Sequence, residues 1–91
     1  MTTWQYARLI IQPVPIQEGG AYNYWHALWL DPDGRIVELG RFDPRSHPLE
    51  PWRVNRWHLQ VLNRTGSDRW ELMHIQAYES DYHYLFKRPT L

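Results

Sequence analysis

The chain has 91 residues and a formal net charge of zero, with ten basic and ten acidic residues. Its length fits a single domain, residues 1–91, and its neutral balance argues against general binding to nucleic acid or to a membrane surface. The sequence contains no cysteine, which excludes disulfides and thiolate metal sites. Neither a secretory signal nor an apolar run near the ~20 residues of a membrane span is present, so we expect a cytoplasmic protein.

The first predicted element is a strand over residues 4–13, WQYARLIIQP, which is rich in aromatic and β-branched residues. Two alternating sets of side chains divide its faces: Trp4, Tyr6, Arg8 and Ile10 on one side, and Gln5, Ala7, Leu9 and Ile11 on the other. Both sets include apolar groups, so we expect a central strand with both faces covered. Pro13 is predicted to end the strand, and residues 13–23 are predicted to form an irregular loop.

A β-hairpin follows, with predicted strands over residues 24–30 and 35–39. The turn between them is Asp31-Pro32-Asp33-Gly34, in which Pro32 presets the backbone and Gly34 can adopt the left-handed conformation. Residues 41–51 contain three prolines and are predicted to form a loop.

An amphipathic helix is predicted next, because apolar and aromatic side chains recur at helical spacing at Val54, Trp57, His58, Val61 and Leu62. Pro51 suits its first turn and Gly66 suits its C-terminal cap. Strands are then predicted over residues 70–78 and 82–87, joined by a short loop at residues 79–81. Placing Tyr78 opposite Tyr82 sets a trial register for this second hairpin.

This order, β-β-β-α-β-β, predicts an α+β fold in which a five-stranded antiparallel sheet carries one helix in a second layer. One helix can cover only one face of such a sheet. The sequence leaves two possibilities open for that face. The helix could cover the side of Met73, Ile75 and Leu85, or the side of Trp70, Leu72 and Phe86.

The run LQVLNRTGSDRWELMHIQAY, followed by YLFKRP, resembles a family of small bacterial domains of unknown function. Members typically read Leu-Asn-x-x-Gly-x-x-Gly-Trp-Glu-Leu-Val and end in Phe-Lys-Arg-Pro, and the match lies mainly within residues 55–89. The matching residues are Leu62, Asn63, Gly66, Trp70, Glu71, Leu72, Phe86, Lys87, Arg88 and Pro89. The resemblance implies a helix followed by a β-hairpin, but it implies no activity. Arg69 replaces a glycine of the pattern, although arginine tolerates a positive φ poorly.

The residues that could carry chemistry do not form a recognisable group. The five histidines, at positions 26, 47, 58, 74 and 83, lack the spacing of metal ligands, so we expect no metal and no other cofactor. Ser46 and His47 are adjacent but do not form a catalytic triad, and no nucleophile-elbow motif occurs. We therefore expect a protein that is not an enzyme.

The best candidate for a binding surface is a set of aromatic and polar residues predicted on one sheet face. Its members are Tyr6, His74, Gln76, Tyr78, Tyr82 and Tyr84. Tyrosine is favoured where an apolar contact has a wet edge. The helix adds a basic stripe with possible anion contacts at Arg53, Arg56 and Arg64.

Three functions remain open from the sequence. The first is a non-catalytic protein–protein interaction module, acting as a homo-oligomer or as an accessory subunit of a larger complex. The second is a single-stranded nucleic-acid-binding domain that stacks bases on the sheet aromatics beside the arginine-bearing helix, although the zero net charge makes this the weaker hypothesis. The third is a small enzyme or ligand-binding protein with a pocket lined by Trp57, His58 and Trp70.

Overall fold

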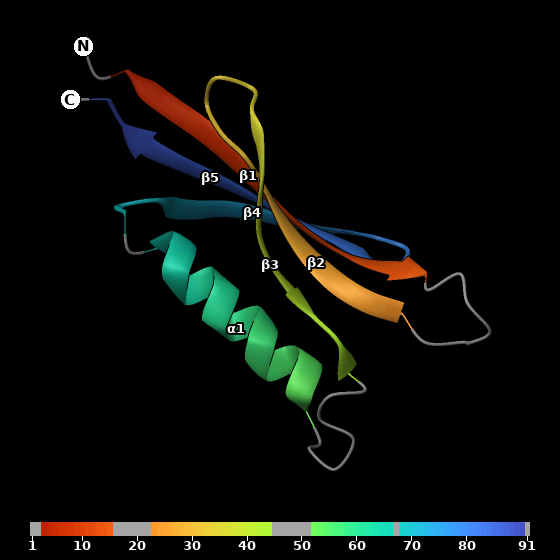
Figure 1. Ribbon diagram of the computed structural model, residues 1–91. Helices are drawn as coiled ribbons and strands as arrows, with labels where there is room; N and C mark the ends of the chain where they lie inside the picture. The colour runs from red at the N-terminus through yellow and green to blue at the C-terminus, as the bar shows by residue number, and fades with distance from the viewer. Residues whose placement is uncertain (1–2, 16–22, 45–51, 67, 91) are drawn as a thin grey trace.

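A computed structural model of the chain describes residues 3–15, 23–44, 52–66 and 68–90 (Figure 1). Within these residues the elements in chain order are β1 (Trp4–Pro15), β2 (Asn23–Leu30), β3 (Ile36–Phe42), α1 (Arg53–Gly66), β4 (Glu71–Tyr78) and β5 (Asp81–Pro89). The strands form one antiparallel sheet in the order β3-β2-β1-β5-β4. The predicted α+β class, with five antiparallel strands and one helix, agrees with this architecture.

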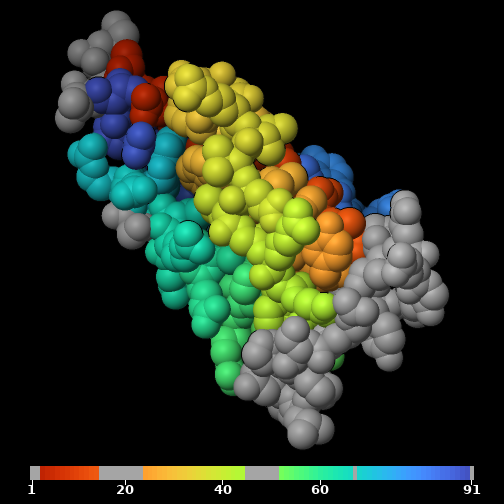
Figure 2. Space-filling model, viewed as in Figure 1, coloured from red at the N-terminus to blue at the C-terminus, as the bar shows by residue number. Residues whose placement is uncertain are grey.

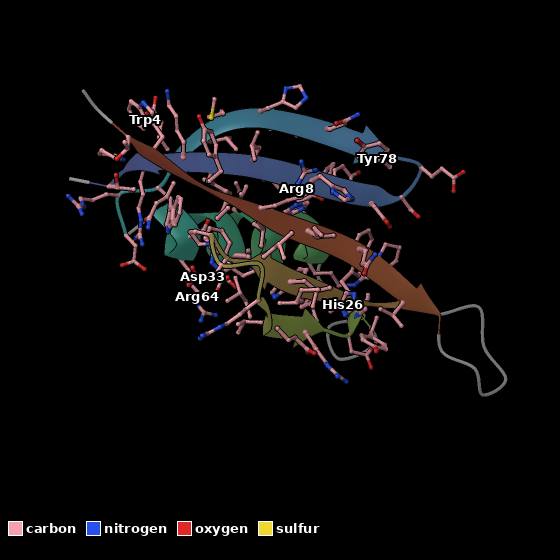
Figure 3. The ribbon with its side chains drawn as sticks, turned by 90° about the horizontal axis from the view of Figure 1, so that it is seen from above. Trp4, Arg8, His26, Asp33, Arg64 and Tyr78 are labelled. Carbon is pink, nitrogen blue, oxygen red and sulfur yellow. The ribbon has the colours of Figure 1, made fainter. Side chains whose placement is uncertain are left out.

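The helix α1 lies against one face of the sheet, and the core lies between them (Figure 1). Leu9 and Ile11 of β1 are fully buried there, and Val61 of α1 belongs to the same cluster. We call the opposite side the open face, because no described element covers it (Figure 3). The prediction that both faces of the first strand are covered is therefore wrong, and Tyr6 on the open face is 50% exposed.

The strand β1 continues to Pro15, two residues beyond its predicted end at Pro13. Its pairing with β5 ends at Ile11, whereas its pairing with β2 continues to Pro15. Past Ile11 the strand therefore pairs with β2 alone among the described strands. An edge position tolerates proline, because the missing N–H can face away from the ladder. The predicted loop that follows lies largely outside the described residues.

The turn between β2 and β3 forms as its sequence predicts. Gly34 has a φ of 84°, and its N–H donates to the Asp31 carbonyl at 2.9 Å. The Asp31 carboxylate accepts hydrogen bonds from the backbone N–H groups of Asp33 and Arg35. Beyond this turn, β3 runs three residues further than predicted, to Phe42. Phe42 then stacks on Trp57 of α1 at 5.7 Å between ring centroids, and side chains of β3 (yellow) lie beside those of α1 (green) in Figure 2.

The end of α1 differs in detail from the prediction. Gly66 is the last helical residue, and the left-handed backbone follows at Arg69, which has a φ of 65°. Arg69 thus adopts the conformation that suits the glycine of the related pattern, at a cost of roughly 1–2 kcal/mol for a residue with a side chain. Pro51, predicted in the first helical turn, lies outside the described residues.

The register of the β4–β5 hairpin differs by one residue from the trial register. Tyr78 pairs with Asp81, and residues 79–80 form a two-residue turn. Gln76 therefore lies opposite His83, and Ala77 lies opposite Tyr82. Because neighbouring residues of a strand point to opposite faces, this single-residue shift exchanges the faces of the β5 side chains up to Leu85 relative to β4. The bulge between Leu72 and His74 then restores the predicted facing for Phe86 and Lys87.

Candidate functional site

The candidate site is the open face, which is built from alternate residues of four strands. Strand alternation buries Ala7, Leu9 and Ile11 against α1 and turns the residues between them outward. Strand pairing then extends this outward row to β2, β5 and β4. The outward residues that the site uses are Trp4, Tyr6, Arg8, Gln12, His26, His74, Gln76, Tyr78, His83 and Lys87 (Figure 3).

Polar side-chain contacts on the open face bridge three strands. The Gln12 amide oxygen lies 2.7 Å from His26 Nε2, and the Gln12 amide nitrogen donates to Asp81 Oδ2 at 3.2 Å. Arg8 Nη1 lies 3.3 Å from His83 Nδ1 on the neighbouring strand. These contacts link side chains of the adjacent strands β2, β1 and β5. The hydrogen bonds restrict the conformations of these side chains.

Aromatic rings lie towards both ends of the open face. At one end, Lys87 Nζ lies 4.3 Å from the centroid of the Trp4 ring, a distance that suits a cation–π contact. At the other end, the Tyr78 ring meets His83 edge-on at 4.8 Å between centroids. The β5 partners of Tyr6 and Tyr78 are six residues apart, so these two rings are separated by about 20 Å along the sheet.

A shallow depression of about 170 Å³ lies beside the Tyr6 ring. It is lined by Tyr6, Ala7, Arg8, Leu30, Asp31 and Leu85. The volume is below the ~300 Å³ at which pockets for small-molecule ligands begin. A depression of this size, with one guanidinium and one carboxylate at its border, suits a single side chain of a protein partner.

The structure divides the predicted binding set between the two faces. Tyr6, His74, Gln76 and Tyr78 lie on the open face. Tyr82 and Tyr84 lie on the other face, where both rings pack against His58 of α1. Tyr84 is only 6% exposed and belongs to the core, so its predicted place among the outward tyrosines is wrong. The cause is the two-residue turn, which reverses the facing of β5 relative to β4.

The arginines of the predicted basic stripe are not brought near the outward rings. Arg53, Arg56 and Arg64 all belong to α1, which lies against the opposite face of the sheet. Arg53 Nε donates to the Pro44 carbonyl at 3.1 Å, and Arg64 borders a depression beside Trp70. A single-stranded nucleic acid that stacks its bases on the sheet would need aromatic rings and arginines on one surface. These residues do not form such a combined surface.

No protein-family model, no curated protein and no solved structure matches this chain. The resemblance in the C-terminal half therefore stays a prediction, and the functional argument depends on the geometry of the chain itself.

A second depression lies between the end of α1 and the sheet. Its volume is about 260 Å³, and its lining residues are Trp29, Leu39, Arg64, Thr65, Asp68 and Trp70. Of the predicted pocket residues, Trp70 is present, whereas Trp57 stacks on Phe42 and His58 packs on Tyr84. The predicted ligand pocket is therefore not formed by these three side chains together.

The described residues contain no feature of two other classes of site. No group of three or more potential ligands could hold a metal ion in that part of the chain. Nor does any helix of the described segments have the length and apolar character needed to cross a membrane. The adjacent pair Ser46 and His47 lies outside the described residues.

Trp4, Arg8 and His83 belong to the open face but were absent from the predicted set. The signal for Trp4 and Arg8 was present, because both share the alternation of Tyr6 along the first strand. His83 could not be found in this way, since its face depends on the register of the last hairpin. Sequence alternation alone could therefore have enlarged the set on β1 but not on β5.

On the covered face, a hydrogen bond joins the helix to the sheet. The Tyr84 hydroxyl lies 2.6 Å from His58 Nε2, and Tyr82 meets the same imidazole edge-on. Burial lowers the pKa of His58 below its ordinary value of 6.5, so a neutral ring can accept a hydrogen bond from the Tyr84 hydroxyl. Burial, together with neighbouring Tyr82, raises the pKa of Tyr84 and keeps its hydroxyl protonated.

This pair predicts lower stability in mild acid. The unfolded chain protonates His58 near pH 6.5, whereas the folded chain does so only at lower pH. Between those pKa values the unfolded state binds more protons. The free energy of unfolding should therefore fall as the pH drops from about 7 through 6.5, and this contribution should level off below the folded pKa. Urea unfolding of wild type and His58→Gln across this range measures the effect.

In His58→Gln that part of the pH dependence should disappear. The matched variant His74→Gln, on exposed β4, should keep it. Parallel pH profiles for wild type and His58→Gln would contradict the assignment of the effect to the helix–sheet contact.

Proposed function

We propose that this chain is a non-catalytic protein-interaction module that binds a protein partner with its open face, as an accessory subunit or within a homo-oligomer. The observation that carries the proposal is the one-sided cover of the sheet. α1 shields the face of Leu9, while Trp4, Tyr6 and Tyr78 on the other face are 41%, 50% and 46% exposed. Outward aromatic rings of this kind are enriched where proteins bind one another.

The arrangement of the open face supports a protein partner. Large rings lie at its two ends, Arg8 lies between them, and the hydrogen-bonded side chains of Gln12 and His26 lie level with Tyr78. Interfaces combine anchoring aromatic contacts with polar groups that fix register in this way. The hydrogen bonds within the network hold those groups in place before binding, which lowers the entropy lost on association.

The size of the face indicates the class of complex. The open face spans four strands about 4.8 Å apart and extends about 20 Å along them. Its projected area is therefore roughly 400 Å². That is about half of the ~800 Å² that each partner contributes to a stable interface of standard size. The open face alone therefore suits a transient complex, or a stable one in which the partner also contacts an edge of the sheet.

Replacement of Tyr6 tests the proposal. Tagged wild-type protein and Tyr6→Ser are purified from the organism of origin, and retained proteins are quantified by mass spectrometry. Because an aromatic anchor at an interface can contribute about 2 kcal/mol, we expect Tyr6→Ser to weaken binding about thirtyfold and to lose the partner. Titration calorimetry with that partner, once purified, then measures the change in Kd.

Leu59→Ser is the matched control, because Leu59 is also a large exposed apolar residue but lies on α1. It should retain the partner as the wild type does. Retention of no specific protein by the wild type, or equal retention by Tyr6→Ser, would refute the open face as the binding surface. Urea unfolding of all three proteins shows whether the serine variants remain folded.

A further inference from the structure

The strand β4 forms one edge of the sheet, and its outer side faces no described element (Figure 3). All eight of its residues are exposed. Leu72, Met73 and Ile75 are each more than 40% exposed, which is unusual for large apolar side chains on a strand that lacks a second neighbour. Half of its backbone N–H and C=O groups point outward and can pair with another strand.

The two edges of the sheet differ in their protection. The other edge, β3, carries an ion pair between Glu38 and Arg41, which places two charges on its border. Charged residues and proline are the usual means by which proteins block pairing at an edge. Within β4, Glu71 at the first position is the single Asp, Glu, Lys or Arg, and no proline occurs. A bulge between Leu72 and His74 disturbs the first part of the strand, and residues 74–78 are regular.

We infer that β4 binds the β4 strand of a second copy of this chain, antiparallel across a two-fold axis near Gln76, and so joins two sheets into one of ten strands. This register keeps the faces of both sheets aligned, since residues opposite each other share a face. Ile75 then lies opposite Ala77 of the partner, a large side chain against a small one. His74 lies opposite Tyr78, and Gln76 lies opposite its own copy.

Charge complementarity selects an antiparallel second copy as the occupant. At the start of β4, the basic residues Arg69, Lys87 and Arg88 outnumber the acidic Asp68 and Glu71. At its end, Glu79 and Asp81 are acidic and no basic residue accompanies them in residues 78–82. An antiparallel pair places the basic end of each strand beside the acidic end of the other, twice. Zero net charge adds no overall repulsion between copies.

This inference goes beyond the proposed function, because it concerns the edge of the sheet and does not depend on the open-face partner. Sedimentation velocity of the purified chain should show a species of twice the 11.1 kDa chain mass at concentrations up to about 100 µM. Ile75→Lys places like charges near the two-fold axis and should raise the Kd of the dimer at least tenfold. Val37→Lys makes the same change at an exposed position of β3 and should leave the dimer intact.

The natural absence of cysteine allows a direct test of register. Gln76→Cys should form an intermolecular disulfide under mild oxidation, because directly opposed strand residues lie within the 4.4–6.8 Å between Cα atoms that a disulfide requires. Glu38→Cys on β3 should not. A wild-type chain that sediments as a monomer throughout this range, or a dimer unaffected by Ile75→Lys, would overturn the inference.

The same variants separate the two proposals. Tyr6→Ser should remain dimeric and lose the open-face partner. Ile75→Lys should lose the dimer and still bind the open-face partner, because its Tyr6 ring is unchanged. A dimer abolished by Tyr6→Ser and preserved by Ile75→Lys would mean that copies associate through the open face instead of β4.

Discussion

Leu9→Ala will lower the free energy of unfolding by about 2–5 kcal/mol, the range for removing a large aliphatic side chain from a packed core. Leu9 has no exposed surface and lies on the central strand, in a cluster with Ala27, Val61 and Phe86. Strands on both sides and α1 above restrict any collapse around the missing atoms, so part of the cost is the cavity itself. Urea unfolding followed by tryptophan fluorescence measures the change.

Ile10→Ala is the control for this prediction, because Ile10 is the next residue of the same strand and faces the open side. It is partly exposed, so we expect its replacement to cost about 1 kcal/mol. Equal losses for the two variants would contradict the distinction between a covered and an open face. That outcome would also remove the main support for the proposed function, since the open face would then behave as core.

Trp70→Ala will lower the free energy of unfolding by about 3–5 kcal/mol. Trp70 is a buried ring at the junction of the α1–β4 turn and the sheet. It meets Trp29 edge-on at 5.3 Å between centroids, and the Arg88 guanidinium carbon lies 4.2 Å from its ring centroid. Removing the ring loses both contacts and enlarges the adjoining depression. Thermal and urea unfolding measure the loss.

Trp52→Ala is the matched tryptophan control, because Trp52 is 75% exposed. Its replacement should change stability by no more than about 0.5 kcal/mol. Trp70→Phe should fall between the two, because phenylalanine keeps an aromatic ring against Trp29 and Arg88 but fills less of the site. A loss for Trp70→Ala no larger than for Trp52→Ala would show that this ring does not hold the turn against the sheet.

Much of the local structure could be predicted from the sequence. The period of apolar residues identified α1, and the Asp31–Gly34 turn formed as its residues require. The positive φ of Arg69 shows that the turn before Trp70 has the geometry of a glycine turn even without glycine. By contrast, Pro13 was a misleading stop signal, because whether proline interrupts a strand depends on which of its edges is already paired.

The candidate site could be predicted in part. Alternation placed Tyr6 on one side of β1 with Trp4 and Arg8, and the structure keeps that grouping. The tyrosines of the last hairpin could not be placed, because a turn of two residues and a turn of three residues put Tyr84 on opposite faces. The residues 79–81 are all compatible with a turn, and nothing local distinguishes the two lengths.

The sequence by itself determined the kinds of elements, their order of appearance along the chain and the turn at Gly34, because helical period, strand alternation and turn residues act over a few neighbouring positions. Only the tertiary structure decided which face α1 covers, which tyrosines remain outward and which strand is left as an unprotected edge. Those outcomes depend on contacts between residues far apart in the chain, such as His58 with Tyr84 and Arg8 with His83. Packing chooses among registers that local preferences leave nearly equal in free energy.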